Sequence, residues 1–488
     1  MQISLLLDLA ADSFPERIAI DGPAGQVSYE GLRTRARVLA HYLQSAEVAA
    51  CGYLGVNSPD VAAGLFGAAL AGVPFAPLNY RLPDADLRRL ALRLAPAVIL
   101  ADDDMAPRLA GLDGVKVLSR HDFASLPEGA EPDWAEGDTA VQLFTSGTSG
   151  EPKAALLSHD NLTSYIMQTV EFASAGEDEA GLVSVPPYHI AGISALLSSV
   201  CATRRIVQLP AFDPTLWVAA VARYRVTSAM LVPTMLSRIL DVLPEGETLP
   251  SLRALACGGG RMPRPVILAA LARLPHVGFT NAYGLTETSS TISLLGPEDH
   301  DLCRSGDAQA LQRLDSVGRP VPGIEVEIRD PEGRLCGPME PGEVMVRGEQ
   351  VSGRYAGRSA VDAGGWFATR DRGWMDAEGY LFLDGRLDDV IVRGGENISP
   401  GEIEDVLRAD PRVADVAVIG APDVEWGEKI VAFVVARDEI SPPELQDLVK
   451  DRLRSTRVPG EIRFCAELPY NDTGKLLRRV LRDRLTAA

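Results

Sequence analysis

Residues 145–153, Thr-Ser-Gly-Thr-Ser-Gly-Glu-Pro-Lys, combine groups that favour phosphate binding. The glycines allow backbone N–H groups to approach an anion closely, the hydroxyls add donors, and Lys153 supplies a mobile positive charge. The apolar run Val141–Phe144 enters this loop as a strand. The segment is not a Walker loop, because Gly150 and Lys153 are only three residues apart. On composition alone, a flexible Ser/Gly surface loop is the alternative.

Two further segments could bind other parts of a nucleotide. Cys257–Pro263, CGGGRMP, follows an apolar run, and its glycines expose backbone on which a flat ring can lie. In Asn281–Thr288, NAYGLTET, Glu287 lies among hydroxyl side chains. A carboxylate near phosphates suits Mg²⁺, which usually takes one or two carboxylates together with phosphate oxygens. Taken singly, either segment is equally typical of an ordinary turn.

Three segments carry single residues of interest. His189 lies between apolar segments in VPPYHIAG, where a histidine is usually a packed core residue. Asp371 in TRDRGW and Arg386 in DGR can bind ribose hydroxyls and an anion, or they can form a charged hairpin surface. Lys475 follows a glycine turn in NDTGKLLRR, where a solvent-exposed lysine is the ordinary interpretation.

The identity and order of these motifs resemble the adenylate-forming (AMP-binding) superfamily, of the acyl-CoA synthetase or acid–CoA ligase type. TSGTSGEPK is similar to its phosphate loop, and NAYGLTET to its Y-G-x-T-E motif. DGRLDDVIVRGGENISPGEIE resembles its hinge and the first segment of its mobile lid, and NDTGKLLRR its motif with the catalytic lysine. The resemblance runs from about residue 10 to residue 485.

The resemblance implies an enzyme, an AMP-forming acid–thiol ligase that uses ATP, Mg²⁺ and coenzyme A. A carboxylate attacks the α-phosphorus of ATP, which gives acyl-AMP and pyrophosphate. The CoA thiol then takes the acyl group and AMP leaves. A stand-alone adenylation enzyme that passes the acyl group to a carrier-protein pantetheine or to an amine is the alternative.

The resemblance also assigns roles to residues. Lys475 would stabilise charge on the reacting carboxylate and α-phosphate, Thr286 would contact the α-phosphate, and Glu287 would bind Mg²⁺. His189 matches a family histidine at the junction of the acyl pocket and the thiol path, which replaces its interpretation as a core residue. The implied nucleotide- and CoA-binding residues are Thr145, Ser146, Gly147, Thr148, Ser149, Gly150, Lys153, Gly258, Gly259, Asn281, Ala282, Tyr283, Gly284, Asp371, Arg386, Gly394 and Gly395.

A moving C-terminal lid is a further implication. The lid would turn about Asp388, delivering Lys475 for adenylation and then Gly394 and Gly395 to line a narrow thiol tunnel. One position departs from the family, which usually has Thr-Gly-Asp where this chain has Thr369-Arg370-Asp371. We expect Arg370 to be tolerated.

The surrounding sequence predicts an α/β fold. Helical patterns alternate with short apolar runs in the first half, which favours helix-wrapped, mainly parallel sheets. After about Val317, dense Gly and Pro with alternating strands predict antiparallel hairpins and a small β-barrel-like part over about 317–386. We expect an N-terminal adenylation domain over 1–386 and a small α+β C-terminal lid domain over 387–488.

Composition limits the partners. The 488 residues carry 47 Lys and Arg against 67 Asp and Glu, a net charge of −20, which disfavours nucleic acid on average. The six cysteines form no CxxC pair, so we expect a reducing, cytoplasmic location without a zinc site or disulfide framework. No apolar stretch is long enough to predict a membrane span. The sequence does not define the oligomeric state, and a homodimer is among the arrangements left open.

The expected acyl pocket is mainly apolar, and its candidate side chains are Val185, Ile190, Ile193, Met230, Val232, Ala282 and Ile292. Pro-Pro-Tyr stands before His189 where amino-acid-activating relatives usually carry an Asp, so we expect a small carboxylic acid without an α-amino group. Aryl, cyclic or medium aliphatic acids are favoured. Two other classes remain: a binding protein that has lost the reaction, and a kinase or P-loop ATPase, which the spacing of the loop disfavours.

Overall fold

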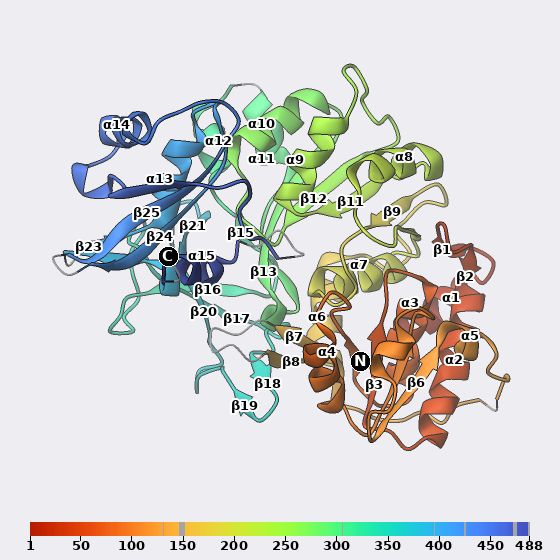
Figure 1. Cartoon of the computed structure of the whole chain (residues 1–488). Helices are drawn as coiled ribbons and strands as arrows, with labels where there is room; N and C mark the ends of the chain where they lie inside the picture. Colours follow the sequence, from red (N-terminus) through yellow and green to blue (C-terminus); the bar gives the residue numbers. More distant parts are fainter. Residues whose placement is uncertain are drawn as a thin grey trace.

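The computed structural model describes residues 1–129, 131–145, 152–304, 306–394, 396–423, 426–471 and 476–486. Figure 1 shows a large N-terminal part, coloured red to cyan, against which a small C-terminal domain in blue is packed. Within these ranges, no helix combines the length and apolar character needed to cross a membrane.

A nine-stranded sheet forms the centre of the large domain. Its central strands, from β13 to β1, run parallel, and antiparallel strands complete its edges. Its order is β15 (Arg319–Pro320), β14 (Ser290–Leu295), β13 (Gly278–Leu285), β12 (Ala254–Gly258), β11 (Ser228–Leu231), β9 (Ala180–Val183), β10 (Arg205–Gln208), β1 (Ile18–Asp21) and β2 (Val27–Ser28).

An eight-stranded sheet forms the other half of the domain. Its five strands β7, β4, β3, β5 and β6 are parallel, whereas β8, β18 and β19 extend it in antiparallel fashion. Its order is β19 (Arg358–Ser359), β18 (Arg354–Tyr355), β8 (Lys153–Ser158), β7 (Thr139–Thr145), β4 (Phe75–Pro77), β3 (Ala50–Leu54), β5 (Ala97–Ala101) and β6 (Val115–Ser119).

One hydrophobic core joins these two sheets. Helix α3 is buried over Pro59–Ala69 on all its faces, as its continuous apolar sequence requires, and it belongs to the same core cluster as α1, α2 and α7. The helices of this domain are α1 (Ser4–Ser13), α2 (Tyr29–Ser45), α3 (Pro59–Leu70), α4 (Asp84–Leu92), η1 (Ala106–Leu109), α5 (Arg120–Ala124), α6 (His159–Thr169), α7 (Ile190–Cys201), α8 (Pro214–Tyr224), α9 (Pro233–Val242), α10 (Arg264–Arg273), η2 (Thr286–Thr288), α11 (Pro297–Arg304) and α12 (Ala308–Arg313). The predicted helix-wrapped, mainly parallel sheets are confirmed.

The Gly- and Pro-rich part forms an antiparallel sheet of four strands. The strands are β16 (Glu325–Arg329), β17 (Gly342–Arg347), β20 (Phe367–Met375) and β21 (Leu381–Arg386), in that order. Among the strands described, this sheet stays open and does not close into a barrel on itself. Its core also includes Ile292 with Tyr283 and Leu285, so β13 and β14 of the neighbouring sheet help to cover its apolar side chains. Because β13 and β14 cover these apolar side chains, the four-stranded sheet does not need to close into a barrel to bury them.

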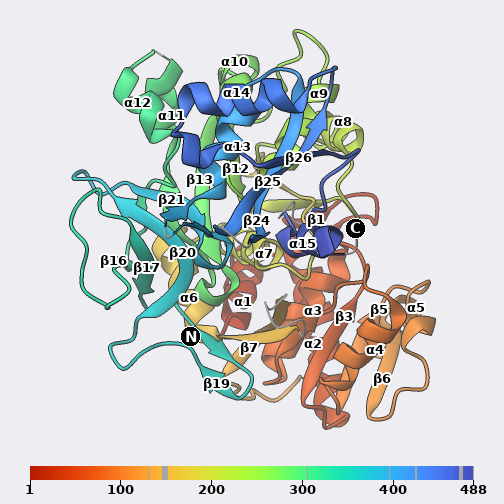
Figure 2. The ribbon, with the colours of Figure 1, turned by 60° about the vertical axis from the view of Figure 1, so that its left-hand side comes forward.

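The C-terminal domain has its own sheet and core. Its strands are β22 (Ile391–Arg393), β23 (Glu396–Ile398), β24 (Val413–Asp423), β25 (Gly427–Ala436) and β26 (Glu461–Phe464), and its helices are α13 (Pro400–Arg408), α14 (Pro442–Arg452), η4 (Ser455–Arg457) and α15 (Arg478–Thr486). The short helix η3 (Leu387–Asp389) connects β21 of the large domain to β22. In the view of Figure 2, this domain lies in front of β12 and β13.

Candidate active site

The β7–β8 hairpin carries the candidate phosphate loop. Thr145, the last residue of β7, pairs with Lys153, the first residue of β8, and its Oγ1 donates to the Lys153 carbonyl oxygen at 3.4 Å. The pairing brings the two ends of the loop together, as an anion-binding turn requires. Five predicted phosphate ligands lie outside the described residues: Ser146, Gly147, Thr148, Ser149 and Gly150.

Glu287, the candidate magnesium ligand, is held through both its side chain and its backbone. It lies on η2, directly after β13, which also carries Tyr283. The hydroxyl of Tyr355 donates to Glu287 Oε1 at 2.6 Å, and the backbone N–H groups of Ser352 and Gly353 donate to the Glu287 carbonyl oxygen at 2.9 and 3.1 Å. Burial is the larger cause and the negative charge of Glu287 the smaller cause of a raised pKa at Tyr355. The hydroxyl therefore keeps its proton and remains a donor near neutral pH.

Asp371 and Arg386 form the candidate ribose site. They are register partners on β20 and β21, and Arg386 Nε lies 3.1 Å from Asp371 Oδ1. The Tyr283 hydroxyl donates to Asp371 Oδ2 at 2.5 Å. Burial, and to a smaller extent the negative charge of Asp371, raises the pKa of Tyr283 well above its usual value. The structure therefore joins Tyr283, one of the predicted nucleotide-binding residues, to the predicted ribose ligands.

A backbone cradle lies beside this pair. Gly258 ends β12, and a Cβ added there would lie 2.8 Å from the carbonyl oxygen of Ala282, so a side chain is excluded. Gly259 follows with φ +79°, a left-handed conformation that suits glycine. Gly284 is packed even more tightly against the backbone at Ser290. Asn281 is buried and donates to the Ser316 carbonyl oxygen at 3.3 Å, so its amide serves the packing of β13.

His189 directly precedes α7, and the rings that follow from it reach a cavity. Its ring lies 4.6 Å from the ring of Tyr188, which in turn meets Tyr80 edge-on at 5.5 Å. The cavity has a volume of about 190 Å³ and is lined by Tyr80, Arg81, Ser184, Pro186, Pro210, Ala211, Phe212, Val232, Thr234, Met235, Arg238 and Asn471. Two arginines in so acidic a chain make this cavity suited to an anion.

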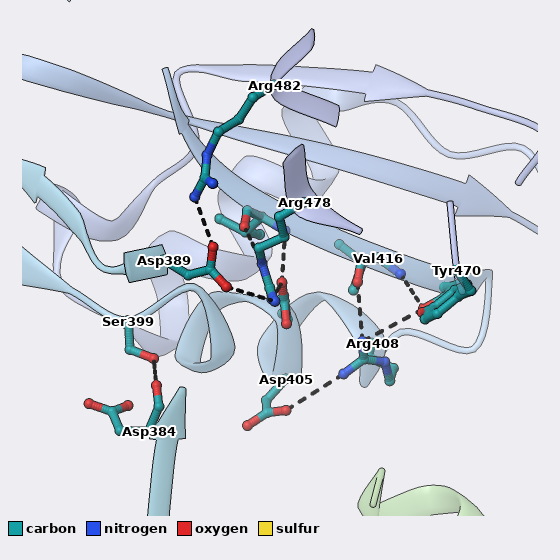
Figure 3. Close-up of polar contacts among 12 residues, drawn as sticks. Asp384, Asp389, Ser399, Asp405, Arg408, Val416, Tyr470, Arg478 and Arg482 are labelled. Carbon is teal, nitrogen blue, oxygen red and sulfur yellow. Dashed lines mark hydrogen bonds and ion pairs between the residues drawn. The ribbon is translucent and has the colours of Figure 1, made fainter. Parts of the chain in front are cut away.

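The linker between the domains carries two aspartates that face opposite ways. Asp388 Oδ1 lies 2.8 Å from Nη2 of Arg370 on β20, in the large domain. Asp389 lies 2.9 Å from Arg482 and 3.7 Å from Arg478, both on α15 of the small domain (Figure 3). Arg370 adopts φ +64° and its side chain is 56% exposed, so it points away from the ribose site, although it directly precedes Asp371.

The lid residues are only partly described. Gly394 follows β22 with φ +58°, and a Cβ there would lie 3.0 Å from the Trp426 ring. Gly395 and the catalytic candidate Lys475 lie outside the described residues. Asn471, the last residue described before Lys475, lines the cavity that also contains Ser184 and Val232.

The residues present fit MgATP. Tyr355 donates to a single carboxylate oxygen of Glu287, so the other can serve a cation. In the part of the chain that is described, no three His, Cys, Asp or Glu side chains converge as a metal cluster. One carboxylate together with phosphate oxygens is a usual Mg²⁺ environment. The Gly258 cradle and the Asp371–Arg386 pair suit a flat base and a ribose.

Two residues of the site, Tyr355 and Gln350, were not singled out from the sequence, because a lone Tyr or Gln in an edge segment carries no motif signal. Ile193 and Ile292, two side chains expected in the acyl pocket, are fully buried in two different core clusters, and their place in the pocket stays a prediction.

Comparisons with known proteins identify the family. Residues 7–356 match the AMP-binding enzyme family, and residues 402–475 match the AMP-binding enzyme C-terminal domain. An indoleacetate–CoA ligase of Aromatoleum aromaticum is 31% identical, over 99% of this chain and 98% of its own. A fatty acid–[acyl-carrier-protein] ligase of Streptomyces coeruleorubidus is 32% identical, over 94% of this chain and 91% of its own.

A solved structure agrees with these relatives. The O-succinylbenzoate coenzyme A synthetase of Bacillus subtilis, in complex with ATP and magnesium ion, superposes with a TM-score of 0.84 at 30% identity and 99% coverage of both chains. The chain therefore belongs to the AMP-binding enzyme family and is an adenylate-forming enzyme of the acyl-CoA synthetase type.

Proposed function

We propose that this enzyme activates an aryl carboxylic acid with ATP and transfers the acyl group to the thiol of coenzyme A. One observation carries the proposal. Strand β13 and the turn after it carry Tyr283, which is hydrogen-bonded to the ribose candidate Asp371, and Glu287, which is hydrogen-bonded to Tyr355. Lys153 lies over the ring of that same Tyr355.

In the first step, a carboxylate oxygen of the acid bonds to the α-phosphorus, and the bond from that phosphorus to pyrophosphate breaks. Lys153 and the phosphate loop hold the leaving pyrophosphate, and Asp371 and Arg386 fix the ribose. Glu287 would hold Mg²⁺, which would neutralise phosphate charge. Thr286 contacts the α-phosphate, and Lys475 stabilises the charge that develops as two anions meet.

In the second step, the thiol sulfur bonds to the acyl carbon and gives its proton to water, and the bond from that carbon to the mixed-anhydride oxygen breaks, so that AMP departs with this oxygen. Tyr80 lines the 190 Å³ cavity and contacts Tyr188, which contacts His189, and this row of rings supports thiol entry from the side of the cavity. Arg81 and Arg238 line this cavity, and their positive charges suit the phosphate of a phosphopantetheine arm.

That phosphate is common to CoA and to a carrier protein, and one relative is named as a carrier-protein ligase. We favour CoA because the other two reported relatives are named as CoA enzymes. Their substrates, indoleacetate and O-succinylbenzoate, are aryl acids, which supports an aryl acid here. Val185, shortly after β9, and Val232, directly after β11, are buried side chains that give the proposed acyl pocket an apolar wall.

The domain division at 386/387, with Asp388 as the hinge, is part of the proposal. It is supported by the two linker aspartates, because Asp388 pairs with the large domain and Asp389 with the small one. A rotation between them keeps Asp389 with the lid and releases Asp388. Gly394 and Gly395 would then line the thiol path.

A cytoplasmic location is also proposed, supported by six cysteines that are all free thiols. The oligomeric state, for which a homodimer was left open, is measured by light scattering of the purified chain.

Pyrophosphate release with MgATP, across aryl, cyclic and linear acids and with or without CoA, tests the function. We expect release that depends on an aryl acid, with AMP and acyl-CoA formed only when CoA is present. Pyrophosphate release without formation of acyl-CoA would indicate that the acyl acceptor is a carrier protein or an amine instead of CoA. ADP as the product would overturn the proposal.

A further inference from the structure

Segment Gln350–Tyr355 fastens the turn that carries Glu287. The amide nitrogen of Gln350, a buried side chain, donates to the carbonyl oxygens of Thr288 at 3.0 Å and Thr291 at 2.8 Å. Ser352 and Gly353 hold the Glu287 carbonyl oxygen, as described above. The turn is therefore supported from one side by a single continuous segment.

The same segment is fastened to the strand of the phosphate loop. Tyr355 on β18 pairs with Ala155 on β8, two residues after Lys153. The Ser352 hydroxyl donates to the Leu156 carbonyl oxygen, and the Ala356 N–H donates to the Ala154 carbonyl oxygen at 3.0 Å. Strand β18 thus links β8 to the Glu287 turn.

Tyr355 stands between two opposite charges. Its hydroxyl lies 2.6 Å from Glu287 Oε1, and Lys153 Nζ lies over its ring, 6.0 Å from the centroid. The guanidinium of Arg358 also lies over this ring, at 5.2 Å. An ammonium and a carboxylate that are free to meet form an ion pair, and each then becomes less available to phosphate or to a metal ion.

We propose that Tyr355 is a positioning residue that keeps Lys153 and Glu287 apart, so that the lysine stays free for phosphate and the carboxylate for the divalent cation. The hydroxyl orients the carboxylate, and the ring face holds the ammonium at a distance. This inference rests on the proposed function, because it takes the roles of Glu287 and Lys153 from there.

Two variants separate the two tasks. Tyr355→Phe keeps the ring and removes the hydroxyl, whereas Tyr355→Leu removes both. Tyr380→Phe is the matched control, because the Tyr380 hydroxyl donates to Asp299 at 2.7 Å in a similar tyrosine–carboxylate pair, on residues without a role in the proposed site. Tyr355 lies on a short, partly exposed strand, and circular dichroism and thermal melting check that the variants fold.

The measurements use the full-length protein and do not depend on turnover. Mn²⁺ bound in the presence of ATP is titrated by electron paramagnetic resonance, and ATP binding without metal is titrated by calorimetry. We expect Tyr355→Phe to weaken Mn²⁺ binding by about tenfold, the effect of losing one hydrogen bond to a charged group, with metal-free ATP binding unchanged. Tyr355→Leu should also weaken metal-free ATP binding by severalfold, because Lys153 would then pair with Glu287.

Unchanged Mn²⁺ binding in Tyr355→Phe would overturn the role of the hydroxyl. Identical behaviour of the Phe and Leu variants in metal-free ATP binding would overturn the role of the ring. Glu287→Gln in the same titration separates this inference from the proposed function: if that substitution leaves Mn²⁺ affinity intact, the metal assignment of Glu287 itself fails, whatever Tyr355 does.

Discussion

The proposed nucleotide site and the domain boundary are held together by different kinds of contact. In the nucleotide site, two tyrosine hydroxyls bind two carboxylates, Tyr283 to Asp371 and Tyr355 to Glu287, at 2.5 and 2.6 Å. At the boundary, two of the contacts are ion pairs between exposed side chains, and the Ser399 hydroxyl donates to the Asp384 carbonyl oxygen. Arg370 and Asp388 are 56% and 46% exposed, and Arg261 and Asp405 are 50% and 47% exposed.

This difference matches what each region must do. The partly buried tyrosine–carboxylate pairs fix the groups that are proposed to meet ATP, since a carboxylate shielded from water is costly to leave without its donor. Exposed ion pairs contribute only about 0–1 kcal/mol each, so a lid held by them can leave without a large penalty. The site is therefore rigid where chemistry needs order, and weakly joined where the proposed rotation occurs.

The largest effect is expected from the lid. Lys475→Ala should reduce adenylation by several orders of magnitude, because the charge of two meeting anions loses its stabilising cation. Transfer from supplied acyl-AMP to CoA should stay largely intact. The two half-reactions are measured separately, by pyrophosphate exchange and by thioester formation. An equal loss in both would contradict the proposed role of Lys475.

A second lid variant should show the reverse pattern. Gly395→Leu adds a branched side chain to the proposed thiol path, so transfer should fall by roughly a hundredfold or more while pyrophosphate exchange continues. Loss of exchange together with transfer would show that Gly395 serves the first step. Paired with Lys475→Ala, this variant tests whether one lid serves two steps.

Inside the nucleotide site, Asp371→Ala should weaken ATP binding by roughly tenfold to a hundredfold, through loss of hydrogen bonds from ribose hydroxyls to a charged acceptor. Calorimetry with ATP and 2′-deoxy-ATP gives a specific readout. The wild type should distinguish the two nucleotides and the variant much less. A variant that still discriminates fully would remove Asp371 from the ribose site.

Much of this site follows from the sequence, and the reasons for the gaps are physical. Asp371 and Arg386 were predictable as motif residues, but their pairing depends on the register of β20 and β21, which the sequence does not encode locally. Tyr355 was missed because its partners Lys153 and Glu287 are distant in sequence and meet it only through strand β18. The helices and strands themselves were predictable from apolar periodicity. The antiparallel strands after Val317 were predictable too, whereas their sheet was expected to be barrel-like and is open, because long-range cover by β13 and β14 leaves no local signal.

At the linker, Arg370→Gly should have a small effect on ATP binding, less than about threefold. The side chain is exposed and directed to Asp388, and glycine suits φ +64°, so the loss of an ion pair is offset by relief of backbone strain of about 1 kcal/mol. What should change is the balance between the half-reactions, since Asp388 is freed. A gain in ATP affinity above about tenfold would mean that Arg370 obstructs the ribose site.

The smallest effect is expected at the other boundary pair. Arg261 Nη2 lies 2.6 Å from Asp405 Oδ2, joining the glycine-rich CGGGRMP segment to helix α13 of the lid. Arg261→Ala should change the melting temperature by less than about 2 °C and either half-reaction by less than about threefold, because an exposed pair contributes so little. Asp405→Ala is the matched partner variant, and the double variant should equal either single one. A tenfold loss in adenylation alone would show instead that this contact selects the lid position, and the contrast between a rigid site and a weakly joined boundary would then fail.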